Sequence, residues 1–181
     1  MTTLEVARVS GPARAGVPLD AVSFTVADGS IAAVFGDVHS GKRTLLRVIA
    51  GLEPAESGAD ILLGDSSVAH HPVHRRRIGT VLRDAVMFPG SVRDNVLFGL
   101  KQQKWPSDDR DRRAAEMLEI VGLTGAEDDT ASLLSEDERA RVALARALAP
   151  QPSVLLFEAP TAAIDEVLKA DYRTRLREIL R

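Results

Sequence analysis

IAAVFGDVHSGKRTLLRVIA, residues 31–50, joins an apolar run, a glycine-bearing loop and an amphipathic segment. Ile31 to Phe35 is continuously apolar, which is typical of a strand buried on both faces. Thr44 to Ala50 carries apolar residues at helical spacing, and Gly51 follows where a helix would end. The loop between them fits the pattern GxxxxGK. We therefore expect a strand, a loop and a helix in this order.

The loop residues suit a phosphate group. Glycines allow backbone N–H groups to curl around an anion, the start of the next helix adds a favourable dipole, and Lys42 supplies a positive charge. The candidate phosphate-binding residues are Gly36, Asp37, Val38, His39, Ser40, Gly41, Lys42, Arg43 and Thr44. A plain turn is the alternative, and the flanking segments favour phosphate binding over it.

The composition limits the class of protein. Of 181 residues, 45% are hydrophobic and 27% charged, which is typical of a folded domain. The net charge of −3 gives no basic field for nucleic acid, and we interpret Arg75, Arg76 and Arg77 as a solvated strand start. The chain has no cysteines, which excludes disulfides and thiolate metal sites. We expect neither a secretion signal nor a membrane span.

Strands and helices alternate along the chain. Further strands are expected at 4–9, 21–26, 59–63, 78–82 and 154–157, and helical segments within 94–134, over 135–148 and from 165 onward. This order predicts an α/β fold with a mainly parallel sheet core, N-terminal antiparallel strands and a helical side lobe. We expect a single domain over residues 1–181, with its core in 1–83 and 150–181 and its helical lobe at about 84–149.

Several segments carry a family resemblance, in this order and spacing: AVSFTVADGSIAAVFG, GKRTLLRVIAGLEPAESG, RRRIGTVLRDAVMFPGSVRDNVLFGL and LSEDERARVALARALAPQPSVLLFEAPTAAID. Together they resemble the ATP-binding domain of ABC transporters over nearly the whole chain. The resemblance implies a P-loop NTPase core of the RecA-like type. It also implies a helical lobe that docks on a transmembrane subunit, and a head-to-tail dimer with ATP between its subunits.

The positions that carry catalysis in this family differ here. The hydroxyl residue that ligates Mg²⁺ after the loop lysine is Arg43, which either reaches phosphate oxygens itself or faces solvent. The glutamine that follows the strand at 78–82 is Arg83. The Asp-Glu pair that holds the metal and activates water is Glu158-Ala159, and alanine cannot orient or deprotonate water. We therefore assign no catalytic residue, and expect weak ATP binding without a firm Mg²⁺ site.

Other family contacts to the nucleotide are also missing. The aromatic residue that stacks on adenine aligns with Ala13, whereas Asp165 of the dimer-contact loop is kept. The histidine that contacts the γ-phosphate, and a strand that would flank residues 31–35, are expected to be absent from this chain. The histidines present are His39, His70, His71 and His74. No acid or cysteine completes a site around HHPVH, so we expect no metal site there.

The helix at 135–148 begins with three acids. In the family this stretch reads LSGGQ, and its serine and glycine N–H groups hold the γ-phosphate bound to the other subunit. Leu134 and Ser135 match, but the rest is Glu136, Asp137 and Glu138. A carboxylate about 5 Å from a phosphate repels it by about 3 kcal/mol at an effective dielectric constant of about 20. Ser135 and Glu138 form a capping-box pattern instead, and the acids could alternatively pair with Arg43 of a second copy.

The sequence predicts a degenerate ABC-type ATP-binding subunit, structural or regulatory, with weak or no ATP hydrolysis by itself. One alternative is an active ATPase half that a conventional ATP-binding partner completes, and another is a partner-binding module outside transport. The expected partners are an ABC-type ATP-binding subunit, in a homo- or heterodimer, and a transmembrane permease subunit. The retained stretch VMFPGSVRDNVLFGL, which approaches the membrane subunit in the family, favours the permease. We expect a cytoplasmic protein on the inner face of the membrane.

Overall fold

The computed structural model describes residues 2–11, 19–159 and 174. The chain forms two compact units, Met1–Ile78 and Gly79–Arg181. Ala13 and Asp165, which the sequence analysis singled out, lie outside the described residues, as does the helical segment expected from residue 165. The division into a core at 1–83 and 150–181 and a lobe at 84–149 stays a prediction.

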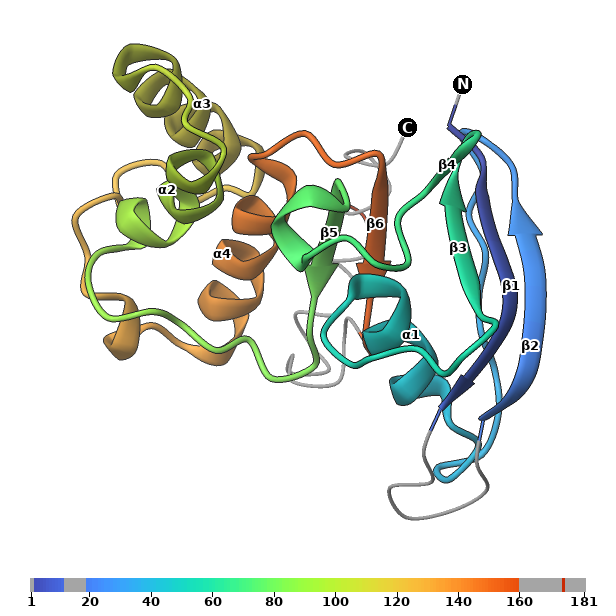
Figure 1. Ribbon diagram of the computed structural model, residues 1–181. Helices are drawn as coiled ribbons and strands as arrows, with labels where there is room; N and C mark the ends of the chain where they lie inside the picture. Colours follow the sequence, from blue (N-terminus) through green and yellow to red (C-terminus); the bar gives the residue numbers. More distant parts are fainter. Residues whose placement is uncertain (1, 12–18, 160–173, 175–181) are drawn as a thin grey trace. The chain divides into compact units, whose positions relative to one another are not determined.

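The first unit is built on a four-stranded antiparallel sheet in the order β2-β1-β3-β4 (Figure 1). Its strands are β1 (Leu4–Gly11), β2 (Leu19–Val26), β3 (Asp60–Leu63) and β4 (Ser66–Ser67). Val6 pairs with Phe24 on one side and with Ile61 on the other, and Val6 and Ile61 are both fully buried. Helix α1 (Lys42–Ala50) packs against β1 and buries its apolar face there.

The strand expected at Ile31–Phe35 is not formed. This segment has no regular secondary structure, and no strand of the described residues pairs with it. The side chains of Ile31 and Phe35 are 81% and 89% exposed. The prediction was wrong because an apolar run becomes a doubly covered strand only where other strands pair with both of its edges. The helix after the loop is confirmed and begins at Lys42.

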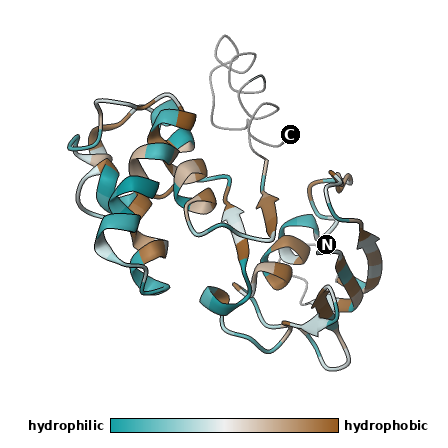
Figure 2. Ribbon diagram, turned by 90° about the horizontal axis from the view of Figure 1, so that it is seen from above, coloured by the Kyte–Doolittle hydropathy of each residue, from teal (hydrophilic) through white to brown (hydrophobic). Residues whose placement is uncertain are grey.

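In its described residues, the second unit contains three packed helices, α2 (Val92–Gln102), α3 (Ser107–Ile120) and α4 (Glu136–Leu148). The strands β5 (Ile78–Val81), which begins at the boundary of this unit, and β6 (Val154–Phe157) form a two-stranded sheet. Each helix contacts the other two. Their amphipathic character is visible in Figure 2, where hydrophobic and hydrophilic residues share each helix. The fully buried side chains at their centre are Val92, Val96, Leu100, Leu118 and Val142.

The other expected strands, and the helices expected at 44–50 and 135–148, are present with ends that differ by at most two residues, whereas the helical stretch expected within 94–134 forms α2 and α3 and ends at Ile120. The β6 strand has the predicted bounds, and α4 begins after Ser135 as predicted. The architecture is therefore α/β, as the sequence analysis predicted. Two short 3₁₀ turns complete it, η1 (Val73–Arg75) and η2 (Ala131–Leu133).

Candidate functional site

The phosphate-loop candidate, Gly36–Thr44, is a turn that leads directly into α1. Ser40 donates to the carbonyl oxygen of Asp37 from its N–H at 3.1 Å and from its hydroxyl at 2.8 Å. Gly41 precedes the helix with φ of 80°, a left-handed conformation that favours glycine. No side chain within the described residues caps α1 at this end.

Lys42 folds back over this turn. Its ammonium donates to the carbonyl oxygen of Gly36 at 2.5 Å, to the carbonyl oxygen of Asp37, and to the hydroxyl of Ser40 at 3.2 Å. The positive charge thus lies among acceptors of the loop itself. An anion that enters the loop would compete with these acceptors for the ammonium group.

The nine loop candidates occupy a continuous segment, Gly36–Gly41 in the loop and Lys42–Thr44 in the first turn of α1, and they face different surroundings. Val38, His39 and Arg43 are exposed. Thr44 is half-buried and packs against β1, since a Cβ added at Gly11 would lie 2.9 Å from its methyl group. The arginine in the metal-ligand position of the family is therefore at the surface, while the threonine after it helps to pack α1 on the sheet.

The start of α4 has the capping box that the sequence predicted. The N–H and the hydroxyl of Ser135 donate to one carboxylate oxygen of Glu138 at 2.8 and 2.7 Å, and the hydroxyl accepts from the Glu138 N–H at 3.3 Å. These hydrogen bonds from Ser135, first from its hydroxyl and then from its backbone, hold the pKa of Glu138 below its usual value. The polar groups of Ser135 are thus engaged within the helix itself.

The three acids of this segment have different environments. Asp137 is buried and forms an ion pair with Arg141 at 2.8 Å, with side-chain exposures of 11% and 14%. Glu136 is exposed, and Glu138 is held in the cap. The sequence analysis treated all three as surface charges and missed this buried pair. The spacing of Asp137 and Arg141, four residues apart on a helix, was the signal that could have indicated it.

The positions that the sequence analysis compared with catalytic residues of the ABC family, namely Arg83, Glu158 and Ala159, follow the ends of β5 and β6. The N–H of Glu158, just after β6, donates to the carbonyl oxygen of Val81, the last residue of β5, at 2.9 Å. Arg83 follows two residues later and is exposed. Ala159 is exposed and has φ of 49°. Within the described part of the chain, no group of three or more His, Cys, Asp or Glu side chains could hold a metal ion.

A cavity that the sequence analysis did not identify lies between the segment after β5 and the start of α4. Its volume is about 410 Å³. It is lined by Asp84, Ala85, Val86, Met87, Ser132, Glu136 and Arg139. Its walls therefore combine an apolar stretch with two acids and one arginine.

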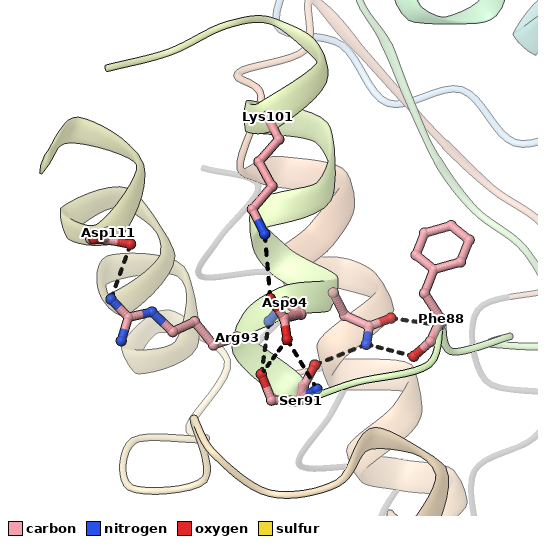
Figure 3. Close-up of polar contacts among 7 residues, drawn as sticks. Phe88, Ser91, Arg93, Asp94, Lys101 and Asp111 are labelled. Carbon is pink, nitrogen blue, oxygen red and sulfur yellow. Dashed lines mark hydrogen bonds and ion pairs between the residues drawn. The ribbon is translucent and has the colours of Figure 1, made fainter. Parts of the chain in front are cut away.

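Buried Asn95 on α2 fixes the loop that continues from this cavity. Its amide donates to the carbonyl oxygens of Phe88 and Ser91, each at 3.0 Å, and accepts from the Phe88 N–H at 2.8 Å. Arg146 of α4 donates to the Asn95 side chain at 3.2 Å and lies 4.8 Å from the centre of the Phe88 ring. Figure 3 shows this region, with a second capping box formed by Ser91 and Asp94.

A family model described as ABC transporter matches residues 19–162. The chain belongs to the ABC transporter family. Its α/β fold is accordingly of the P-loop NTPase class, and the family resemblance found in the sequence is confirmed. In the described part of this ABC family member, no helix is long and apolar enough to cross a bilayer.

Several ABC family proteins from bacteria are similar to the chain. A sulfate/thiosulfate import ATP-binding protein of Thermosynechococcus vestitus is 43% identical over 159 residues, covering 87% of this chain and 47% of that protein. An Fe(3+) ions import ATP-binding protein of Streptomyces avermitilis is 40% identical over 162 residues, covering 89% of this chain and 47% of the relative. A sulfate/thiosulfate import ATP-binding protein of Mycobacterium tuberculosis is 42% identical over 164 residues, covering 90% and 46%. The chain spans about half the length of these curated relatives.

Proposed function

We propose that this chain is a degenerate ATP-binding subunit of an ABC-type import system, with a structural or regulatory role. In this proposal it binds ATP weakly, depends little on Mg²⁺, and has little or no ATPase activity by itself. The import direction is taken from the names of its relatives, which are ATP-binding proteins for the import of sulfate, thiosulfate or Fe(3+) ions.

The observation that carries this proposal is the capping box at α4. If Ser135 is to hold a phosphate, its N–H and hydroxyl must leave the Glu138 carboxylate, to which they donate at 2.8 and 2.7 Å. A phosphate could accept the same hydrogen bonds, but it would have to displace the Glu138 carboxylate and lie close to its negative charge, which repels it. Glu136 adds a further negative charge at the surface. The start of α4 is therefore organised for helix stability rather than for an anion.

Weak ATP binding is proposed because the phosphate loop keeps its glycines and its lysine and leads into the start of a helix. The ammonium of Lys42 already has acceptors in Gly36, Asp37 and Ser40. A phosphate must replace them, which reduces the net gain from the charge. Arg43 in place of a hydroxyl residue brings positive charge to the position where the family holds a cation, and this opposes Mg²⁺ binding.

Hydrolysis is proposed to be weak because the group in the position of the catalytic base is a methyl group. Ala159 cannot accept a proton from water, and loss of a general base alone typically reduces a rate by about 10²–10⁴. Glu158 and Arg83 stand where the family has an aspartate and a glutamine. No residue of this chain is assigned to replace those groups.

The proposed partners are a second ABC-type ATP-binding subunit and a transmembrane permease subunit, which would place the chain on the cytoplasmic face of a membrane. The cavity beside Asp84–Met87 supports the permease, because it combines apolar walls with the charges of Asp84, Glu136 and Arg139. Phe88, fixed by Asn95, borders the same loop.

The test is a titration of the purified chain with a fluorescent ATP analogue, with and without Mg²⁺, together with an ATP turnover assay. We expect weak binding that Mg²⁺ does not strengthen, and turnover no higher than in Lys42→Ala. Lys101→Ala is the matched control, since Lys101 is a partly exposed lysine on α2 that pairs with Asp94 at 3.3 Å. Tight Mg²⁺-dependent binding, or turnover that Lys42→Ala abolishes, would contradict the proposal.

The second candidate function is an active ATPase half, and the 40–43% identity to import ATP-binding proteins favours it. Here a conventional ATP-binding partner completes one composite site. A mixture of the two chains would then hydrolyse ATP faster than the partner alone, and Lys42→Ala in this chain would remove the increase.

A further inference from the structure

Arg76 is buried in the first unit, with only 5% of its surface exposed. Its guanidinium donates to the carbonyl oxygens of Val48 and Ile49, each at 2.9 Å. It also donates to the carbonyl oxygens of Ala69 at 2.6 Å and His71 at 2.9 Å. The interpretation of this arginine as part of a solvated strand start was therefore wrong, because its side chain turns inward to these carbonyls.

These acceptors belong to two segments that are distant in sequence. Val48 and Ile49 are in the last turn of α1, where carbonyl groups carry partial negative charge, and the Val48 carbonyl also accepts from the Gly51 N–H at 3.0 Å. Ala69 and His71 belong to the segment that contains HHPVH. The guanidinium thus joins the end of α1 to that segment, and the helix dipole compensates part of the cost of burying the cation.

Gly51 makes this contact possible. It follows α1 with φ of 80°, and a Cβ at this position would lie 2.5 Å from the Nε atom and 2.7 Å from the Cζ atom of Arg76. Only glycine leaves room for the guanidinium against the helix end. The glycine at the C-terminal end of α1 is therefore required for the Arg76 side chain to pack there.

The two ends of α1 are held differently. The helix has nine residues, which is too short to be stable by its own hydrogen bonds. Its other end begins at the phosphate loop, where the Leu45 N–H donates to the Gly41 carbonyl at 2.9 Å and no described side chain forms a cap. Because a short helix moves as a rigid rod, the position of its first turn depends on how its last turn is fixed.

We propose that Arg76 is a positioning residue for the phosphate loop, acting through α1 from a site at the far end of the helix. It fixes the last turn of α1 and thereby the direction of the first N–H groups that face the loop. The nucleotide part of this inference rests on the proposed ATP binding, whereas the effect on the loop itself does not.

The test compares Arg76→Lys and Arg76→Met with a variant of equal stability in the full chain. Lysine keeps the charge but cannot donate in the geometry of a guanidinium, and methionine keeps the length without the charge. The matched variant is Ile61→Val or Ile61→Ala in β3, whichever reproduces the urea midpoint of Arg76→Lys. Ile61 is fully buried in the same unit and is not among the hydrogen-bond acceptors of the Arg76 guanidinium, which are carbonyls of Val48, Ile49, Ala69 and His71.

Two measurements decide the outcome. Hydrogen exchange of the Leu45 amide should be about tenfold faster in Arg76→Lys than in the matched Ile61 variant. The dissociation constant of ATP should rise by about fivefold in Arg76→Lys relative to the same control. The increase in the Leu45 exchange rate and the increase in the dissociation constant of ATP should both be larger in Arg76→Met than in Arg76→Lys.

Equal Leu45 exchange in Arg76→Lys and the matched Ile61 variant would overturn the inference, because Arg76 would then act on global stability only. If exchange of the Leu45 amide were faster but the affinity for ATP unchanged, the part of the inference that concerns nucleotide binding would be overturned. If the wild-type chain does not bind ATP, the proposed function fails, and the exchange measurement still decides whether Arg76 positions the loop.

Discussion

The phosphate loop and the start of α4 are both turns that lead into a helix, and they use their N–H groups in opposite ways. At α1 the residue before the helix is Gly41, which has no side chain to form a cap, and the nearby positive charge of Lys42 is bonded to the loop. At α4 the cap of Ser135 and Glu138 takes up the polar groups at the helix start. The comparison shows that one carboxylate in the first turn of a helix decides how the polar groups at its start are used. They are bonded by that carboxylate where it is present, as in α4, and not where it is lacking.

The largest effect on stability is expected for Asp137, the buried acid at the start of α4. Asp137→Asn should lower the free energy of unfolding of the second unit by about 3 kcal/mol, because it removes the charge that faces buried Arg141. Urea unfolding followed by the fluorescence of Trp105, the chain's one tryptophan, measures this unit. The matched control is Asp109→Asn, whose pair with Arg112 is exposed, and a loss of about 0.5 kcal/mol or less is expected there. Equal losses in the two variants would show that Asp137 is not a structural acid.

A smaller effect is expected at the cap itself. Ser135→Ala should lower the free energy of unfolding by about 1 kcal/mol and leave the affinity for ATP unchanged, because Ser135 bonds to Glu138 rather than to phosphate. Ser91→Ala, in the equivalent capping box of α2, is expected to have the same cost. Urea unfolding and the ATP titration measure the two quantities. If Ser135→Ala weakened ATP binding and Ser91→Ala did not, Ser135 would contribute to ATP binding, and the proposed difference between the starts of α1 and α4 would be wrong.

The smallest effect is a dependence of the cap on pH. Because the pKa of Glu138 is lowered in the folded chain, the unfolded chain binds its proton first as the pH falls. The contribution of the cap is therefore complete above the ordinary glutamate pKa of about 4.3 and is lost as the pH falls through the folded value. The stability difference between the wild type and Ser135→Ala should shrink below about pH 4.5. A difference that stays constant from pH 7 to pH 3 would contradict the role of the carboxylate.

Local patterns in the sequence were enough to predict the elements that depend on local contacts. The alternating apolar residues of β1, the apolar run of β6 and the spacing of Ser135 and Glu138 each have their predicted structure. The turn at Gly36–Thr44 was also predictable, since its glycines and lysine are read directly from the chain.

Features that depend on distant partners were not predictable in this way. The run Ile31–Phe35 has strand composition, but composition does not state whether other strands pair with it. Arg76 lies in a run of three arginines, and only the fold brings the carbonyls of α1 to it. The prediction that Arg43, Arg83 and Ala159 occupy positions where the family has other groups came from the family resemblance, because periodicity carries no such information.

The pairing of β1 with β3 has a consequence for the order of folding. Leu4 pairs with Leu63, so the chain between these strands, with the phosphate loop and α1 inside it, forms one long closed loop. Closing a long loop costs chain entropy before its contacts are gained, and such pairings form slowly. We therefore expect the phosphate loop to take its shape late, after the helices of the second unit, whose capped starts and neighbouring contacts are local in sequence.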